Sequence, residues 1–281
     1  MPHFILTLTC QDRPGIIHAV AGALLDVSAN VLEQAQFTDQ DSGLFAMRTR
    51  FEAPGDDAAS VREVIEARTA GFVPSVDVRL EQSRRRALVM VSKYDHCLVD
   101  LLYRYDNGEL PVEIPLVVSN HEDCRPLAER HGIPFVVLPV TPETKREQEQ
   151  ELLALVEEHA IDVVVLARYM QVLSDDLCSR LPGRIINIHH SFLPGFKGAR
   201  PYHQAHARGV KLIGATAHFV TADLDEGPII EQGVERVDHS STPEDLAEIG
   251  RDVERLVLAR AVRLFAEDRI VLDGKRTIVF G

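Results

Sequence analysis

The alternation of hydrophobic and polar positions predicts a small mixed domain at the start of the chain. After a strand-like run at residues 3–10, Asp12–Gly15 is typical of a turn, and Pro14 suits the first turn of a helix. The apolar residues of that helix recur at helical spacing, at Ile16, Val20, Leu24 and Val27. The predicted elements are a strand at 3–10, a helix to about 28, strands at 31–38 and 44–51, a helix at 58–70 and a strand at 75–80. This βαββαβ order predicts a ferredoxin-like domain over residues 1–83.

Beyond residue 84, strand-like runs alternate with helical stretches. The strands are expected at 87–91, 114–118, 134–138, 161–166, 184–188, 212–220 and 229–237, and the helices near 97–105, 123–131, 143–159, 174–180 and 243–267. The run Val163–Leu166 is apolar without alternation, which favours a central strand covered on both faces. Residues 84–281 are therefore predicted to form an α/β domain with a Rossmann-like, mainly parallel sheet. We interpret Arg84–Arg86 as a solvated linker at the boundary.

Composition and charge narrow the class of partner. The 281 residues are 45% hydrophobic and 26% charged, which excludes a disordered or collagen-like chain. A net charge of −13 opposes attraction to nucleic acid or an anionic membrane and favours a small molecule. No run approaches the roughly 18 apolar residues of a membrane span, and no signal peptide is recognised. Four scattered cysteines without a C-x-x-C pair indicate reduced thiols, so we expect a soluble cytoplasmic protein.

Chemistry is expected where the parallel strands end, because ligands of open α/β sheets bind outside the carboxyl ends of the strands. After the first of these strands, Ser92–His96 contains no glycine and includes an acidic residue. A phosphate-binding turn needs glycines that let backbone N–H groups approach the anion. The sequence therefore disfavours a bound nucleotide phosphate at this turn.

Two polar segments carry the candidate catalytic residues. Asn187 and His189 are two residues apart on a predicted strand, so their side chains point to the same side of the sheet. The second segment, His218–Pro228, runs from a strand into an acidic loop that contains Asp225. A carboxylate from this loop can reach the imidazole, and the three groups together can act on one substrate atom.

Each of these residues also has a structural explanation. A strand histidine is often only hydrogen-bonded, an asparagine at a strand end supports a turn, and the acidic residues can form a solvated turn. Metal binding is a further alternative, because histidines are frequent at His189, His190, His203, His206 and His218. They lack the spacing of a zinc protease, so no metal site is predicted. A serine hydrolase is disfavoured because there is no G-x-S-x-G motif.

The segments that carry these residues resemble a known family. Asn187–Pro194, Ala215–Phe219 and Leu224–Pro228 are similar to the formyltransferase fold of glycinamide ribonucleotide transformylases. More narrowly, the chain resembles the formyltetrahydrofolate deformylase family over nearly its whole length, through Ser119–His121, Ala167–Gln171, Ile188–Pro194 and Lys275–Phe280. The transformylases have a glycine-bearing phosphate loop where Ser92–His96 stands here, and they lack the N-terminal domain.

The resemblance implies an activity and a set of site residues. It implies hydrolysis of 10-formyltetrahydrofolate to formate and tetrahydrofolate, which balances the one-carbon folate pool and supplies formate for purine synthesis. The family's catalytic residues fall on Asn187, His189 and Asp225, and the folate pteridine is expected against Met170, Gln171, Val172 and Leu173. Folate and water are the expected partners, and no cofactor is required because a formamide hydrolyses without electron transfer.

The N-terminal domain resembles an ACT domain, a regulatory binding module. The resemblance implies side-by-side pairing of these domains, and hence a homo-oligomer built from dimers. It also implies an amino-acid effector such as glycine or methionine near Asp12, Arg13, Gly15 and Asn30. Gly15 and Asn30 also have purely local explanations as turn residues.

Three other functions stay open from the sequence. Formyl transfer to an amine would use the same asparagine, histidine and aspartate. Transfer to methionyl-tRNA is less attractive because of the net charge of −13. A non-catalytic amino-acid sensor would bind an effector and release no formate.

Overall fold

The computed structural model describes residues 1–193, 195 and 201–281, and it divides into two compact units. One unit comprises Met1–Arg84 together with Glu267–Gly281, and the other comprises Arg85–Ala266. Pro194, which belongs to one of the motifs behind the family resemblance, lies outside the described residues. Among the helices that are described, none combines the length and the apolar composition needed to span a bilayer.

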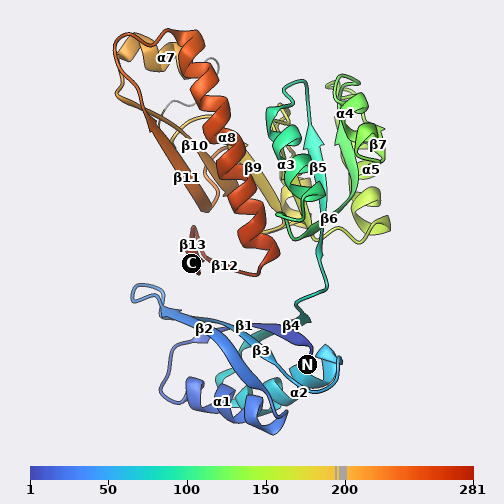
Figure 1. Ribbon diagram of the computed structural model, residues 1–281, viewed down its shortest axis with the longest axis vertical. Helices are drawn as coiled ribbons and strands as arrows, with labels where there is room; N and C mark the ends of the chain where they lie inside the picture. Colours follow the sequence, from blue (N-terminus) through green and yellow to red (C-terminus); the bar gives the residue numbers. More distant parts are fainter. Residues whose placement is uncertain (194, 196–200) are drawn as a thin grey trace. The chain divides into compact units, whose positions relative to one another are not determined.

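The first unit has the ferredoxin-like fold predicted from its alternating pattern (Figure 1). Its antiparallel sheet has the order β2-β3-β1-β4, and two helices and a 3-10 turn complete it. The elements are β1 His3–Gln11, α1 Ile16–Asp26, β2 Asn30–Thr38, β3 Leu44–Glu52, α2 Ala58–Thr69, η1 Ala70–Phe72 and β4 Ser75–Leu80. Phe4, Leu6 and Leu8 alternate along β1 and enter one core with Ile16 of α1 and Ile65 of α2.

A C-terminal hairpin covers the other face of this sheet. Its strands are β12 Ile270–Asp273 and β13 Arg276–Val279, and Val271, Ile278 and Phe280 form a core cluster with Ala46 of β3. Ala46 alternates with Phe45 and Met47, which face the helices. The hairpin was not predicted, and the sequence-based boundary wrongly placed it in the second domain. Strands of four residues carry too short a pattern to be recognised.

The second unit is built on a seven-stranded sheet of order β11-β10-β9-β8-β5-β6-β7 (Figure 1). Strands β5 to β9 are parallel, whereas β10 and β11 are antiparallel additions at one edge. The strands are β5 Arg85–Val91, β6 Val112–Ser119, β7 Phe135–Val137, β8 Val163–Leu166, β9 Ile185–His189, β10 Leu212–Phe219 and β11 Ile229–Arg236. All seven were predicted, with boundaries shifted by no more than a few residues.

Within the described residues, six helices accompany this sheet. They are α3 His96–Asp106, α4 Arg125–Arg130, α5 Lys145–Glu158, α6 Asp175–Arg180, α7 Pro201–Arg208 and α8 Pro243–Ala266. Leu88, Met90 and Val164 pack with residues of α5 and α6, while α8 packs on β9, β10 and β11 and against α3. Helix α7 was not predicted, because it is only eight residues long and four of them are polar or charged.

Two of the three arginines interpreted as a linker belong to the sheet. Arg85 and Arg86 begin β5, and the Arg86 backbone N–H donates to the Asp162 carboxylate at 2.7 Å. The Arg86 side chain donates to the carbonyl of His159 at the end of α5, also at 2.7 Å. The linker interpretation was wrong here because a run of like charges does not reveal partners that are distant in sequence.

The order of the strands places a switch point at β5. Both β6 and β8 pair with β5, so the connections leave it in opposite directions. A crevice opens at the carboxyl ends of strands where such a reversal occurs. The segments after Val91, Leu166 and His189 therefore meet there.

Candidate active site

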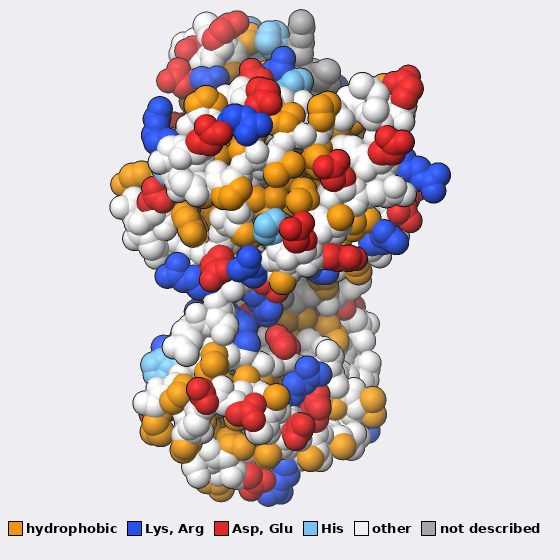
Figure 2. Space-filling model, turned by 90° about the vertical axis from the view of Figure 1, so that its right-hand side faces the viewer, with side chains coloured by type: hydrophobic (Ala, Val, Ile, Leu, Met, Phe, Trp, Pro, Cys, Tyr) orange, Lys and Arg blue, Asp and Glu red, His pale blue; other side chains and the backbone are white. Residues whose placement is uncertain are grey.

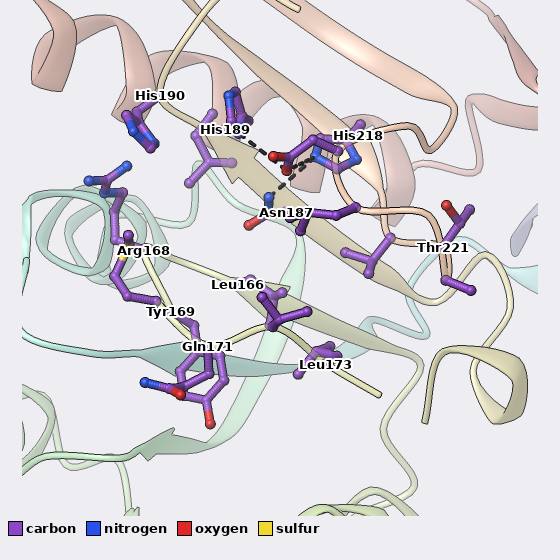
Figure 3. Close-up of a pocket in the computed structure, with 17 residues that line it drawn as sticks. Leu166, Arg168, Tyr169, Gln171, Leu173, Asn187, His189, His190, His218 and Thr221 are labelled. Carbon is purple, nitrogen blue, oxygen red and sulfur yellow. Dashed lines mark hydrogen bonds and ion pairs between the residues drawn. The ribbon is translucent and has the colours of Figure 1, made fainter. Parts of the chain in front are cut away.

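Strands β9 and β10 bring the candidate catalytic residues together. In their antiparallel register Asn187 lies opposite His218, and His189 lies opposite Thr216. Asn187 Nδ2 is 3.2 Å from His218 Nε2, and His189 Nδ1 is 3.2 Å from Asp225 Oδ1. Figure 3 shows Asn187, His189 and His218 converging on one side of the pocket. The predicted convergence of Asn187, His189 and Asp225 is therefore present.

The loop after β10 carries Asp225 back over the end of the sheet. The Phe219 N–H donates to the Pro228 carbonyl at 2.9 Å, and a side chain at Gly227 would clash with the Phe219 carbonyl. Asp225 itself adopts the left-handed region with φ 57°, which is uncommon outside glycine and is often associated with functional sites. The tight return of the loop is what holds the carboxylate at His189.

The electrostatic environment keeps Asp225 charged and His218 neutral. The hydrogen bond from His189 lowers the pKa of Asp225, and this outweighs the opposing effect of burial. Burial lowers the pKa of His218, whose Nδ1 is 2.9 Å from the Phe219 carbonyl. Because a carbonyl only accepts, His218 Nδ1 carries the proton, and Nε2 accepts from the Asn187 amide. The second amide hydrogen of Asn187 is thereby left for a ligand.

His189 presents a second, unused ring nitrogen. The residue is 5% exposed, and its Nε2 is a buried polar atom with no hydrogen-bond partner among the described residues. Its ring lies 5.0 Å from that of His190. Burial and the nearby Arg168 charge lower the pKa of His190 to about 4, so His190 is neutral at physiological pH. An unpaired buried nitrogen beside a charged carboxylate is suited to bind a substrate oxygen.

The three residues open into a cavity of about 210 Å³ (Figure 3). The segment after β8 forms another wall, and all four residues predicted to contact folate line the cavity: Met170, Gln171, Val172 and Leu173. Met170 and Val172 are 51% and 57% exposed, so these two side chains are not part of the core. The seven candidate catalytic and substrate-contacting residues thus share one pocket.

The segment after β8 is held at both of its ends by hydrogen bonds. The Met170 N–H donates to the Ser92 hydroxyl at 2.9 Å, and that hydroxyl donates to Asn120 Oδ1 at 2.7 Å. At the far end, the Ser174 N–H donates to the Glu149 carboxylate at 2.8 Å, where Ser174 caps α6. Two polar anchors therefore hold the intervening segment in place against the carboxyl ends of the strands.

Ten lining residues were not among the candidates from sequence, and three of these ten have basic side chains: Arg168, His190 and His218. His218 lies within a segment that had been singled out, and its cross-strand position opposite Asn187 was the available signal. His190 had been considered from sequence only as a metal ligand, and Arg168 only as part of the Ala167–Gln171 motif. Arg168 has φ 64°, and its guanidinium lies over the Tyr94 ring at 5.3 Å and beside Glu254 at 3.4 Å.

The candidate effector residues do not all gather at one place in a single chain. Asp12, Arg13 and Gly15 lie together between β1 and α1, and Arg13 donates to the Gly71 carbonyl at 2.7 Å. Asn30 pairs in register with Glu52, at the end of the sheet opposite Gln11 and Leu44. Its side chain donates to Glu52 at 3.1 Å. A single copy of the chain therefore separates Asn30 from the β1–α1 turn.

Metal-ligand geometry is not found at the histidines considered from sequence within the described part of the chain. The described residues contain one group whose ligand atoms lie within 4.8 Å of one another, His96, Cys97 and Glu254. In this group the Arg168 guanidinium lies 3.4 Å from the Glu254 carboxylate, so a divalent cation there would be repelled. All four cysteines are free and buried, as predicted from their spacing.

Comparison with known proteins connects this geometry to a family. Residues 85–262 match the family described as formyl transferase. A formyltetrahydrofolate deformylase of Bacillus subtilis is 46% identical over 278 residues, covering 98% of this chain and 93% of the relative. The crystal structure of formyltetrahydrofolate deformylase from Burkholderia mallei has a TM-score of 0.96 and 52% identity over the full length of both chains.

The formyltransferases match a smaller part. Glycinamide ribonucleotide transformylase 1 from Symbiobacterium toebii has a TM-score of 0.66 and 33% identity, covering 70% of this chain and 94% of that structure. The deformylases match both units, whereas this transformylase leaves nearly a third of the chain unmatched. From its motifs, its fold and its full-length similarity, the chain belongs to the formyltetrahydrofolate deformylase family.

Proposed function

We propose that this protein hydrolyses 10-formyltetrahydrofolate to formate and tetrahydrofolate. The observation that carries the proposal is the convergence of Asn187, His189 and Asp225 at the wall formed by Met170–Leu173. An amide donor, an imidazole and a carboxylate are the groups that addition of water to a formyl carbonyl requires. On the face of the molecule drawn in Figure 2, acidic and basic side chains are interspersed, which suits a small-molecule substrate better than a nucleic acid.

Asn187 and His189 are assigned to the formyl oxygen. Attack of water places negative charge on that oxygen, and donors already aimed at it lower the barrier because they need not reorganise. Asn187 supplies its second amide hydrogen, since the first is held by neutral His218. His189 supplies Nε2–H as an imidazolium, with the Asp225 carboxylate on Nδ1 stabilising the charge.

Asp225 is assigned to the nucleophile and the leaving group. Its carboxylate positions the attacking water and takes one proton as the oxygen–carbon bond forms. The proton then passes to N10 of the folate, so that the bond between the formyl carbon and N10 breaks and formic acid leaves. Formic acid releases the second proton of the water to solvent and becomes formate. Water is consumed, and no electron transfer occurs, so the proposed reaction requires no redox cofactor.

The folate ring is assigned to the segment after β8. Backbone groups of Met170–Leu173 and the exposed side chains of Met170 and Val172 offer both polar and apolar contacts to a pteridine. The reaction is placed in the cytoplasm, where four buried free thiols remain reduced. Its role is to balance the one-carbon folate pool and to supply formate for purine synthesis.

The N-terminal unit is assigned to regulation by a small amino acid, glycine or methionine. The exposed turn of Asp12, Arg13 and Gly15 supports this, because Gly15 has φ 103° at the start of α1 and leaves backbone N–H groups near solvent. Asn30 lies at the other end of the sheet, so its participation requires a second copy of the chain. A homo-oligomer built from dimers is proposed accordingly, and sedimentation analysis tests it.

Incubation of the purified chain with 10-formyltetrahydrofolate tests the proposed reaction. Formate and tetrahydrofolate are followed together, and both are expected to appear in equal amounts without an added amine. Consumption of folate only when an amine is supplied would favour a transferase. Binding of amino acids with no formate at any folate concentration would favour a sensor.

A further inference from the structure

Glu254 is a buried charged residue that the proposed hydrolysis does not use. It belongs to α8 and is 1% exposed. Its carboxylate accepts hydrogen bonds from His96 Nε2 at 2.8 Å and from the Tyr202 hydroxyl at 2.7 Å, and Arg168 Nε lies 3.4 Å away. Removing a carboxylate from water is costly, and these three partners offset the cost. Three polar partners around one buried carboxylate indicate that Glu254 has a specific role.

Gly250 makes room for this arrangement. It lies one helical turn before Glu254 on α8, and a side chain there would clash with the ring and hydroxyl of Tyr202. Glycine is unfavourable in the interior of a helix, so its presence here has a local reason. The absent side chain lets Tyr202 lie against α8 and reach the carboxylate.

The Glu254 group, defined as Glu254 with His96, Arg168 and Tyr202, adjoins the active site. Arg168 lines the cavity together with His189 and His190. The ring of His190 lies 5.0 Å from that of His189 and 6.4 Å from that of Tyr202. Only one histidine ring therefore separates the proposed catalytic imidazole from the Glu254 group.

The Glu254 group also lies at the place where this type of sheet binds anions. His96 is the first residue of α3, which follows β5 at the switch point. In open α/β sheets a ligand phosphate is commonly held at that helix start. Here the preceding turn, Ser92–Asp95, has no glycine, and Arg168 lies over the ring of Tyr94 within it. A carboxylate from α8 lies beside this helix start, on the side chain of its first residue, His96.

Glu254 is ionised in this environment. Burial raises its pKa, but the hydrogen bonds from His96 and Tyr202 and the charges of Arg168 and His96 together outweigh burial, so the pKa lies below its usual value. The carboxylate and the guanidinium therefore neutralise each other inside the protein. A dianionic phosphate approaching Arg168 would meet a charge of its own sign.

We propose that Glu254 is a built-in counter-anion. With His96, Arg168 and Tyr202 it occupies the side of the pocket next to Arg168 and His190, where a phosphate-bearing amine would otherwise bind, and it excludes such amines. Water is then the acceptor that still reaches the formyl carbon. This inference rests on the proposed hydrolysis, because it explains why the formyl group is released as formate. Glu254 is a specificity-determining residue in this account and does not touch the reacting atoms.

A metal site is the competing explanation for this group. His96, Cys97 and Glu254 have ligand atoms close enough to share a cation. However, Arg168 Nε and His96 Nε2 both approach the same oxygen, Glu254 Oε2. A divalent cation there would be repelled by the guanidinium, so the counter-anion role is favoured.

Inorganic phosphate is the probe that tests the counter-anion. Glu254→Ala leaves a cavity beside an uncompensated guanidinium, and phosphate is expected to fill it. Thermal unfolding is followed with increasing phosphate, with chloride holding the ionic strength constant. We expect the midpoint of Glu254→Ala to rise by a few degrees, because a ligand that binds only the folded state stabilises it, and the wild type to shift by less than about one degree.

Three matched variants sharpen this test. Glu254→Gln keeps the volume and is expected to show no phosphate response, because the space stays filled. Glu149→Ala removes another buried carboxylate, bound to Ser174, and should respond like the wild type. Glu254→Ser serves as the second opened variant, since it also removes the carboxylate and most of the side-chain volume while keeping a polar side chain.

The outcomes separate this inference from the proposed hydrolysis. Phosphate stabilisation confined to Glu254→Ala and Glu254→Ser supports the counter-anion. An equal response in wild type, no response in either opened variant, or failure of both to fold even in phosphate overturns it. Stabilisation of wild type by zinc, abolished in Glu254→Gln, would show a metal site instead. Absence of formate release by wild type would overturn the proposed hydrolysis itself.

Discussion

The first strand-to-helix turn of each unit begins the same type of βα pair, yet the two turns are built in opposite ways. Between β1 and α1, residues 11–15 are exposed, and Gly15 adopts a left-handed conformation with φ 103°. Between β5 and α3, Ser92 is buried and bound to Asn120 and to the Met170 N–H. The first turn is exposed throughout, whereas the second exposes Lys93–Asp95 but is tied to the neighbouring strand ends through buried Ser92. The cavity that we propose as the active site of the second unit lies at the neighbouring strand ends, around Asn187 and His189.

The largest loss of activity is expected when the pair formed by Asp225 and His189 in the second unit is broken. Asp225→Asn and His189→Ala should each lower kcat/KM by about 10² to 10⁴, because each removes general acid–base help or its charged partner. The midpoint of thermal unfolding should stay within a few degrees of wild type. Formate release measured by a coupled assay checks the rates, and near-normal turnover would remove the residue concerned from the mechanism.

Loss of the amide donor is expected to be somewhat less severe. Asn187→Ala should lower kcat by about 10² to 10³, the usual effect of removing one oxyanion donor. His218→Ala should lower kcat by roughly tenfold with little change in KM, because His218 acts only by orienting that amide. The double variant should be no slower than Asn187→Ala alone. Multiplied effects in the double variant would show that His218 acts independently.

The fold and the convergence of the candidate catalytic residues could be predicted from sequence where a local pattern specified them. The period of two on β9 placed Asn187 and His189 on one side, and the apolar run of β8 identified a central strand. The role of His218 depends on the antiparallel register of β9 and β10, which a single sequence does not contain. Glu254 gave no signal, because its partners come from three other segments of the chain.

The stability of the folded chain should decrease in acid because the neutral pocket histidine His190 resists protonation. The pKa of His190 is lowered to about 4 by burial, so below its usual value of 6.5 the unfolded chain binds a proton that the folded chain does not. Stability should therefore fall as the pH decreases from 6.5 toward 4. His190→Gln should flatten this decrease, as measured by denaturant unfolding across that range. An unchanged slope in the variant would contradict the assignment.

The smallest change in activity is expected from amino acids that bind the exposed turn between β1 and α1. Glycine and methionine are titrated against formate release by the full chain, and we expect one of them to change the rate by a few-fold. Arg13→Ala should weaken that response, because Arg13 braces the turn through the Gly71 carbonyl and the Phe72 ring. No response to either amino acid, together with no binding by calorimetry, would leave the exposed turn without a regulatory role.

The central claim is that water itself receives the formyl group in a pocket closed to larger acceptors. Hydrolysis of 10-formyltetrahydrofolate in ¹⁸O-labelled water, with mass analysis of the formate, tests it most directly. The account predicts one solvent oxygen in each formate and one formate for each tetrahydrofolate. Tetrahydrofolate produced without labelled formate would contradict it, because the formyl group would then have gone to another acceptor.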